Sequence, residues 1–435
     1  MLNWDNPLAA SVPRTNGYRP SLNLVDESFV DESFVDEPTV EVVESERSAK
    51  TQVAIESPTE SATLAASVIG AASGSESMEA ASTAHALRTE RKTFTQEPFK
   101  PQQPVRAEDK RVINGSGDIN QLAPFKYPWA WEFFLNANKN HWTPLDINMA
   151  QDVHDYHHNL STAERHVYEN VLAYLTTSDI LAMRNIGLAV MEKMTAPELQ
   201  IYQARQVYEE ALHTWTYQHC IETIGLDQAE IYNRYRVVPE INGKIQLANR
   251  RLNDALRHDI DLKNRDDLHN FVMSYTFFAG IFEGCWFYNG FSPIFALQRR
   301  GLMKGTGEQL QYIMRDEVLH CSFGIRVVRQ IMQEENVKLD PQAVRDMWDE
   351  AEAAEVNYAK FLLPTPILGY SQQDHHEQFR FTANRRARQL GMDEPFPGAQ
   401  NALPWLDEQS NMRKEKNFFE TRVTEYQTGG ALNWD

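Results

Sequence analysis

The sequence predicts an all-α fold, a four-helix bundle with additional helices. Segments with helical periodicity lie at roughly 163–191, 197–224, 267–291, 307–335 and 341–363, with shorter ones near 246–260 and 370–390. No convincing run of alternating strand residues interrupts them. Two long segments carry a Glu-x-x-His motif, Glu210/His213 and Glu317/His320, which is typical of bundles that hold two metal ions between carboxylates.

The ends of these helices carry recognisable signals. Capping-box patterns or a proline in the first turn mark helix starts at Ser161-x-x-Glu164, Thr195-x-x-Glu198 and Asp340-Pro341. Gly225 fits the end of the second long helix, because glycine readily adopts the left-handed conformation that closes many helices.

Composition divides the chain into three parts. Residues 1–105 are rich in Ser, Ala, Thr, Glu and Val and repeat VDESF at 25–34, so we expect a mostly disordered acidic arm that cannot bury enough apolar surface to offset chain entropy. Residues 110–410 form the predicted helical domain. Residues 411–435 turn polar again and contain Gly429-Gly430, which predicts a flexible tail.

Charge and cysteine usage narrow the functional classes. The net charge of −19 argues against nucleic-acid binding, which needs a basic surface. The polar N-terminal residues show no signal peptide. The apolar stretch 271–297 is interpreted as a core helix and not a membrane span, because Glu283 lies in its middle. Three cysteines have no disulfide or metal spacing, which fits a reducing cytoplasm: Cys220, Cys285 and Cys321.

Two further long segments place a carboxylate inside an apolar run, Asp179 and Glu283. A buried acid costs free energy unless it is paired or binds a cation. Taken singly, each ligand-type residue has a structural explanation, since a lone histidine on an apolar face is more often a core residue. Together with the two Glu-x-x-His motifs they offer four carboxylates and two imidazoles, a hard set that favours iron or manganese over structural zinc.

A tyrosine shares the helix face of the first motif, because Tyr217 follows Glu210 by seven residues. Phe287 and Phe291 share the face of Glu283, and Ile313 precedes Glu317 by one turn. These side chains predict a dry wall in which a radical is protected from water. A buried tyrosine or a phenylalanine stripe is more commonly core packing, and that alternative stays open.

At these residues the chain resembles the small, radical-generating beta subunit of class I ribonucleotide reductase, over roughly residues 110–435. The resemblance includes RDE-x-x-H at 315–320, KEKNFFETRV-x-EYQ at 414–427 and the terminal Trp-Asp. It implies a ferritin-like core whose dimetal centre activates dioxygen and oxidises a nearby tyrosine, here Tyr217. The radical then starts ribonucleotide reduction in a separate large subunit.

The resemblance also assigns ligands and an electron route. One metal would be held by Asp179, Glu210 and His213, and the other by Glu283, Glu317 and His320, with Glu210 and Glu317 bridging. Trp142 matches the near-surface tryptophan of the route, Asp316 the acid that links it to a ligand histidine, and Tyr426 the residue that faces the partner. Their structural alternatives are packing for Trp142, a salt bridge with Arg315 for Asp316, and plain surface exposure for Tyr426.

The metal pair and the reaction have alternatives. Related members that replace the radical tyrosine by phenylalanine use manganese and iron, and carry Glu where Asp179 stands. Because this chain keeps Tyr217 and Asp179, two irons are expected, with manganese–iron as the alternative. A second function for the same fold is a ferritin-like dimetal oxygenase or oxidase acting on a small organic substrate. A third is a non-catalytic helical scaffold or metal store.

Both ends of the chain carry Leu-Asn-Trp-Asp, at 2–5 and 432–435. In the resembled family the C-terminus docks on the large subunit, so Trp434 is the expected anchor. The N-terminal copy, with Trp4, is expected to fit the same groove unless the two ends match by accident. The resemblance further implies a homodimer.

Overall fold

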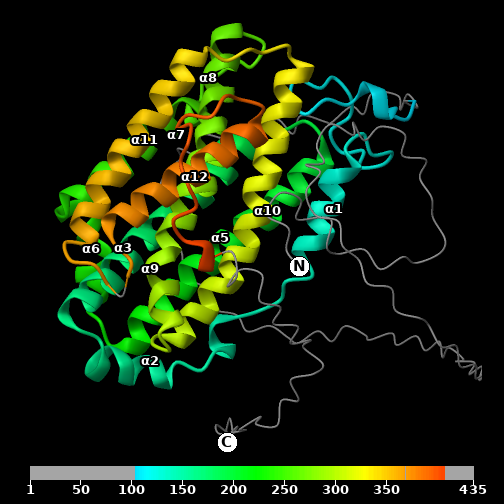
Figure 1. Ribbon diagram of the computed structural model, residues 1–435. Helices are drawn as coiled ribbons and strands as arrows, with labels where there is room; N and C mark the ends of the chain where they lie inside the picture. The colour runs from blue at the N-terminus through cyan, green and yellow to red at the C-terminus, as the bar shows by residue number, and fades with distance from the viewer. Residues whose placement is uncertain (1–102, 368, 407–435) are drawn as a thin grey trace, which may run out of the picture. The chain divides into compact units, whose positions relative to one another are not determined.

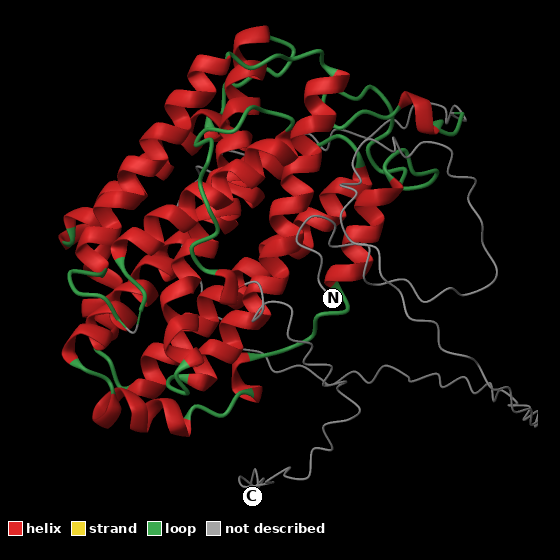
Figure 2. Cartoon of the chain, in the orientation of Figure 1, coloured by secondary structure: helices red, strands yellow, loops and turns green. Residues whose placement is uncertain are grey.

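The structure is a computed structural model that describes residues 103–367 and 369–406. Within these ranges the chain is helical and contains no β-strand, only an isolated bridge between Ile367 and Tyr370 (Figures 1 and 2). The predicted all-α class is confirmed. The predicted acidic arm and the tail from 411 onward lie outside the described residues.

Four helical rods form the core. They are α3 (Thr162–Asn185), α5 (Pro197–Ile224), the rod made of α8 (Arg265–Thr276), the π-helical η6 (Phe277–Phe287) and α9 (Tyr288–Arg299), and α10 (Lys304–Glu334). α3 packs on α5 and α9, and α10 packs on α5, α8, η6 and α9 (Figure 1). The segment taken from sequence as a core helix is this third rod, which is buried along η6 and most of α9.

The remaining helices surround the core. α1 (Pro128–Ala137) packs on α5 and α10, and α2 (Ala150–His154) with η4 (Asp155–Asn159) packs at the start of α10. α6 (Gln228–Val237) and α7 (Pro239–Leu256) lie against α3, while α11 (Pro341–Leu362) and α12 (Gln372–Leu390) pack on η6. The shorter pieces are η2 (Ala107–Asp109), η3 (Pro144–Asp146), η5 (Ile186–Val190) and α4 (Met191–Lys193). No helix among the described residues is long and apolar enough to cross a membrane.

Most of the predicted helix ends are confirmed by their hydrogen bonds. Ser161 and Glu164 form the reciprocal capping box that opens α3, and Asp340 accepts from the backbone N–H of Gln342 at the start of α11. Gly225 closes α5 with φ of 82°, in the left-handed region.

The capping box predicted at Thr195 is wrong. α5 begins at Pro197, and the Thr195 hydroxyl donates to the carbonyl of Arg111, 2.9 Å away. The Glu198 carboxylate accepts from the backbone N–H groups of Lys126 (3.1 Å) and Tyr127 (3.2 Å). Both side chains therefore fasten the segment before α1 to the bundle, and this tertiary contact replaces the local one.

Two glycines, which carry no side chain, set the spacing between η6 and α10. A Cβ added to Gly324 of α10 would lie 2.6 Å from the Cβ of Ala279, and one added to Gly284 would lie 3.1 Å from the Cys321 sulfur. Real Cβ atoms essentially never approach to 2.6 Å, and a contact of 3.1 Å is tighter than most, so these glycines allow the two helices to come close. Their contact lies beside the ligand residues on the same two elements.

Candidate metal centre

The four core rods bring the six predicted ligand residues to one buried place. α3 supplies Asp179, α5 supplies the first Glu-x-x-His motif, η6 supplies Glu283, and α10 supplies the second motif. Each of the six side chains has 0% exposure. Residues separated by as much as 141 positions in sequence thus meet in the core, Asp179 and His320 being the furthest apart.

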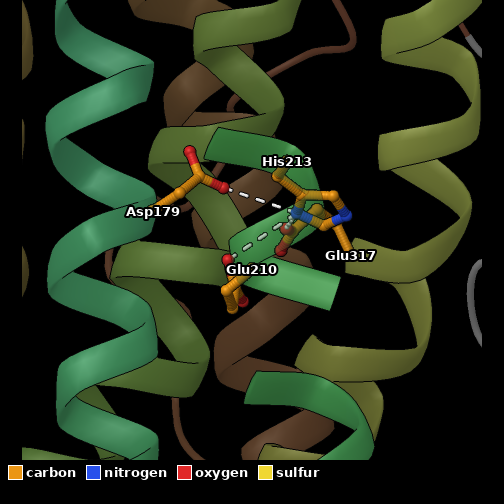
Figure 3. A group of neighbouring side chains, drawn as sticks. All are labelled: Asp179, Glu210, His213 and Glu317. Atoms are coloured by element: carbon orange, nitrogen blue, oxygen red, sulfur yellow. Dashed lines mark ion pairs between the residues drawn. The ribbon is translucent and has the colours of Figure 1, made fainter. Parts of the chain in front are cut away.

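One half of the cluster surrounds the Nδ1 atom of His213. This nitrogen lies 3.3 Å from Glu317 Oε1, 3.4 Å from Asp179 Oδ1 and 3.6 Å from Glu210 Oε2. Figure 3 shows the four side chains pointing toward one another from α3, α5 and α10. One ligand atom from each lies within 4.8 Å of the others, a spacing that fits one metal ion.

The other half surrounds the Nδ1 atom of His320. It lies 3.1 Å from Glu210 Oε1 and 3.6 Å from Glu317 Oε1, and Glu283 completes the group. Glu210 and Glu317 belong to both halves. This is the arrangement expected of carboxylates that bridge two ions.

The atoms that face the centre of the cluster have no hydrogen-bond partner within the part of the chain that the structure describes. They are both carboxylate oxygens of Asp179, Glu210 and Glu317, one oxygen of Glu283, and Nδ1 of His213 and His320. Buried polar atoms are ordinarily satisfied, and so many orphaned acceptors in one place would be costly. Two divalent cations would satisfy them, so the residues present fit a dimetal centre.

The outward-facing imidazole nitrogens are held by carboxylates. Nε2 of His213 lies 3.2 Å from Asp316 Oδ2, and Nε2 of His320 lies 2.8 Å from Glu209 Oε2. A proton on Nε2 leaves Nδ1 bare for a metal, which is the usual support of ligand histidines. Arg205 in turn donates to Glu209 over 2.8 Å.

A second supporting contact comes from an amide. Gln206 donates to Glu283 Oε1 over 2.8 Å, which leaves the other carboxylate oxygen of Glu283 to face the cluster. Sequence reasoning missed both Glu209 and Gln206. Their positions in the sequence were the available signal, since Gln206 lies one turn before Glu210 and Glu209 directly precedes Glu210.

Without cations the cluster has strongly shifted acid–base properties. Burial raises the pKa of Asp179 and of Glu283 well above the usual range. Burial opposes the charged form of His213 and His320, but the surrounding carboxylates outweigh it and raise both pKa values. Burial also acts to raise the pKa of Glu210, yet the two imidazoles lower it to about 2. Metal uptake must displace the bound protons.

Tyr217 lies on α5 one turn beyond His213. It is fully buried, and its hydroxyl has no hydrogen-bond partner among the described residues. Burial, reinforced by the charges of Asp179 and Glu317, raises the phenol pKa well above its usual value, so the side chain is a neutral phenol. The residues predicted to form a dry wall, Phe287, Phe291 and Ile313, are all fully buried as well.

Asp316 connects the cluster to the near-surface tryptophan. Its Oδ2 lies 3.2 Å from His213 Nε2 and accepts from the Trp142 indole N–H over 3.4 Å, while Asn140 donates to Oδ1 over 2.5 Å. Trp142 stacks on Tyr312 with ring centroids 5.4 Å apart. The structure therefore brings Trp142, Asp316 and His213 into one hydrogen-bonded chain.

Three predicted residues lie outside the described residues: Tyr426, Trp434 and Trp4. The roles assigned to them stay predictions.

Comparisons with known proteins agree with this geometry. Residues 119–404 match the family model described as ribonucleotide reductase, small chain. A ribonucleoside-diphosphate reductase subunit beta from Chlamydia pneumoniae is 37% identical over 76% of this chain and 96% of its own length.

Solved structures share the fold. The R2 subunit of ribonucleotide reductase from Clostridium botulinum superposes with a TM-score of 0.64 at 22% identity, covering 69% of this chain and 94% of its own. The Rnr4 homodimer of ribonucleotide reductase from Saccharomyces cerevisiae gives a TM-score of 0.55 at 19% identity, covering 65% of this chain and 84% of its own.

Proposed function

The chain belongs to the ribonucleotide reductase small-chain family, and we propose that its buried cluster holds two metal ions beside Tyr217 and stores a radical on that tyrosine. It is thus the small subunit of a class I ribonucleoside-diphosphate reductase, which acts with a large subunit. The observation that supports the radical role most strongly is the set of orphaned ligand atoms one turn from a buried phenol.

Each residue has a definite task in this proposal. Asp179, Glu210 and His213 would hold one ion, and Glu283, Glu317 and His320 the other, with Glu210 and Glu317 shared. When bound, the metal pair supplies the oxidising power, drawn from dioxygen, that removes one electron and one proton from a phenol. Burial of Tyr217 keeps water and reductants away from the oxygen atom on which the radical rests.

The decisive experiment is electron paramagnetic resonance of the full-length chain, loaded with Fe(II) and exposed to air, together with metal analysis. We expect two irons per chain and a tyrosyl signal. A parallel sample loaded with manganese and iron tests the alternative pair. Two irons with no tyrosyl signal, combined with nucleotide reduction only in the manganese–iron sample, would refute the tyrosyl-radical proposal.

Trp142→Phe is expected to lower nucleotide reduction with the large subunit by about 100-fold or more. Phenylalanine stays aromatic and apolar but lacks the indole N–H that donates to Asp316, so the hydrogen-bonded chain to His213 is broken. Metal content should not change. Turnover assays and metal analysis check this, with Trp131→Phe on α1 as the matched control. Equal activity of both variants would exclude Trp142 from the route.

The terminal tetrapeptides are proposed to dock on the large subunit. The C-terminal copy, with Trp434, would bind its groove and place Tyr426 as the residue that passes oxidising equivalents across. The N-terminal copy, with Trp4, would compete for that groove or add a second contact. An arm of roughly 100 residues, with the flexibility expected from its composition, would have a root-mean-square span of about 50–60 Å, enough to reach across a subunit.

Three deletion variants separate these cases by their affinity for the large subunit. Removing 432–435 should abolish most binding, and removing 2–5 should change the affinity in either direction. Removing both should leave no more binding than removing 432–435 alone, and less if the N-terminal copy docks. Unchanged affinity after removal of 2–5 would show that the N-terminal copy does not dock.

A homodimer is proposed through the face that carries α1, α3, η5 and α5. These elements hold most of the exposed large apolar side chains in the described chain: Leu135, Ile180, Leu188, Tyr208 and Trp215. α5 packs against the other three, so the side chains belong to neighbouring helices. Trp215→Glu should shift the dimer toward monomer in sedimentation, whereas Val237→Glu on α6 should not. Equal mass for both variants would place the dimer interface elsewhere.

We also place the protein in the cytoplasm. The supporting observation is that all three cysteines are free and buried. Cell fractionation tests this.

A further inference from the structure

A lysine is enclosed by aromatic rings inside the bundle. Lys244 of α7 is 1% exposed, and its ammonium lies 4.0 Å from the ring centroid of Tyr174, 4.7 Å from Tyr358 and 4.8 Å from Trp286. Lysine is almost never fully buried unless it is paired. We call these four residues the lysine cage.

One carboxylate holds the ammonium in place. Glu355 of α11 lies 2.5 Å from Lys244 Nζ through Oε2, while its Oε1 accepts from Asn289 over 2.7 Å and lies 2.6 Å from His375 Nε2. Burial acts to raise the pKa of Glu355, but Lys244 and His375 lower it to about 2, so the carboxylate stays ionised. The pair therefore places the ammonium against the three rings, while the second carboxylate oxygen, Oε1, contacts Asn289 and His375.

One ring of the lysine cage, that of Trp286, belongs to η6, the helix that carries Glu283. Trp286 lies three residues after Glu283 on η6, and its ring centroid is 6.2 Å from that of Phe282. Phe282 lies 5.1 Å from Phe287. Trp286, Phe282 and Phe287 therefore form a run of packed rings on the same element as Glu283.

Trp142 and Trp286 have opposite electrostatic surroundings. The indole N–H of Trp142 donates to the Asp316 carboxylate, an anion that favours loss of both an electron and a proton. Trp286 has a cation over its ring, and its indole N–H has no acceptor among the described residues. A positive charge beside a ring repels the charge that the ring would gain on oxidation.

We propose that Lys244 prevents the oxidising equivalent from leaking into the Trp286 side of the bundle, so that it leaves through Trp142. This inference rests on the proposed radical function. The suppressed step takes one electron and one proton from the Trp286 indole N–H and gives both to the Tyr217 phenoxyl oxygen. An indolyl radical and an intact phenol would result. Lys244 opposes the loss of the electron, and the missing acceptor opposes the loss of the proton.

The test removes the cation without leaving its partner charged. The double variant Lys244→Met, Glu355→Gln replaces the buried pair with neutral side chains of similar size, because the single lysine variant would leave a buried carboxylate without its cation. Full-length protein is loaded with Fe(II), exposed to air and followed by electron paramagnetic resonance. Oxidation products on Trp286, Tyr174 and Tyr358 are mapped by peptide mass spectrometry.

We expect the Tyr217 radical to decay about 10-fold faster in the double variant, with oxidation products on the cage. Adding Trp286→Phe should restore most of the lifetime, which a general loosening of the fold would not do. The control is Arg326→Met, which removes an exposed cation lying 4.6 Å from the Trp129 ring and should leave the decay unchanged. Circular dichroism and metal content confirm that each variant is folded and loaded.

The outcomes separate the two proposals. Suppose that the radical forms in the wild type and has the same lifetime in the double variant, with no oxidation products on the lysine cage. The role of Lys244 is then refuted, while the radical function stands. Faster decay that Trp286→Phe does not restore, again without products on the cage, also refutes the role of Lys244. If the wild type forms no oxidant with either metal pair, the radical function fails and the role of Lys244 fails with it.

Discussion

Tyr217→Phe is expected to abolish the tyrosyl signal and to lower nucleotide reduction by about 1000-fold or more in the iron-loaded protein. The hydroxyl is the only group lost, and it makes no hydrogen bond among the described residues. Removing it leaves no unpaired partner, so the fold and the ligand cluster should stay intact, with a stability change below about 1 kcal/mol. Metal analysis, electron paramagnetic resonance and turnover with the large subunit measure the three effects.

The matched control is Tyr202→Phe on the same helix. Tyr202 is also fully buried, and its hydroxyl has no partner in residues 103–367 and 369–406. It packs against Phe133 and Phe323 and takes no part in the proposed radical chemistry. It should retain the tyrosyl signal. Full turnover by Tyr217→Phe with only iron bound would contradict the assignment, whereas turnover that needs manganese and iron would identify the metal pair.

His213→Ala is expected to weaken metal binding by more than about 100-fold and to remove the radical. The substitution deletes one imidazole ligand and also leaves Asp316 without the ring that lies 3.2 Å away. Loss of an outer partner of a ligand already costs about 10–100-fold in metal affinity, so loss of the ligand itself should cost more. Competition with a chelating dye, followed by metal counting after gel filtration, provides the measurement.

His219→Ala is the companion variant, because His219 lies on the same helix, is partly buried and contacts Thr223. It should bind two metals normally. If His213→Ala retained both ions with wild-type affinity, the imidazole would be a core residue and not a ligand. The structural explanation given for a lone histidine, a core residue on an apolar face, would then apply to His213.

The long helices could be predicted because their periodicity and their end signals depend on nearby residues. α3, α5 and α11 begin or end where Ser161, Gly225 and Asp340 indicate. The third rod was predicted too short, at 267–291, because Pro293 ordinarily ends a helix. α9 continues to Arg299 since it is buried against α3, α10 and α12, and packing outweighs one lost hydrogen bond.

Shorter helices were missed or misplaced. α1 and α6 were not predicted, and the helix expected at 246–260 runs from Pro239 to Leu256. These pieces are fixed by contacts with α3, α5 and α8 more than by their own sequence. The capping box at Thr195 failed for the same reason, because the segment before α1 captures both of its side chains.

The six ligand-type residues were easier to predict than the residues that contact them from outside the cluster. Glu-x-x-His spacing and acids within apolar runs are visible in one dimension, and the structure brings all six residues together. Glu209 and Gln206 on α5, and Asn140 in the loop after α1, were not identified, because a polar residue looks like ordinary surface until the neighbouring elements are placed. Sequence position gives a signal for Gln206 and Glu209, but their partners are set by the three-dimensional arrangement.

The close approach of η6 and α10 at Gly324 and Gly284 has a consequence for metal selectivity. With 2.6 Å between an added Cβ at position 324 and Ala279, alanine there would wedge the two helices apart. Glu283 would then retreat from Glu317 and His320, which lie on the opposite helix. The glycine contact therefore holds the two sides of the cluster at one spacing, so we expect adjustment to an ion of a different radius to come from rotation of the carboxylate side chains.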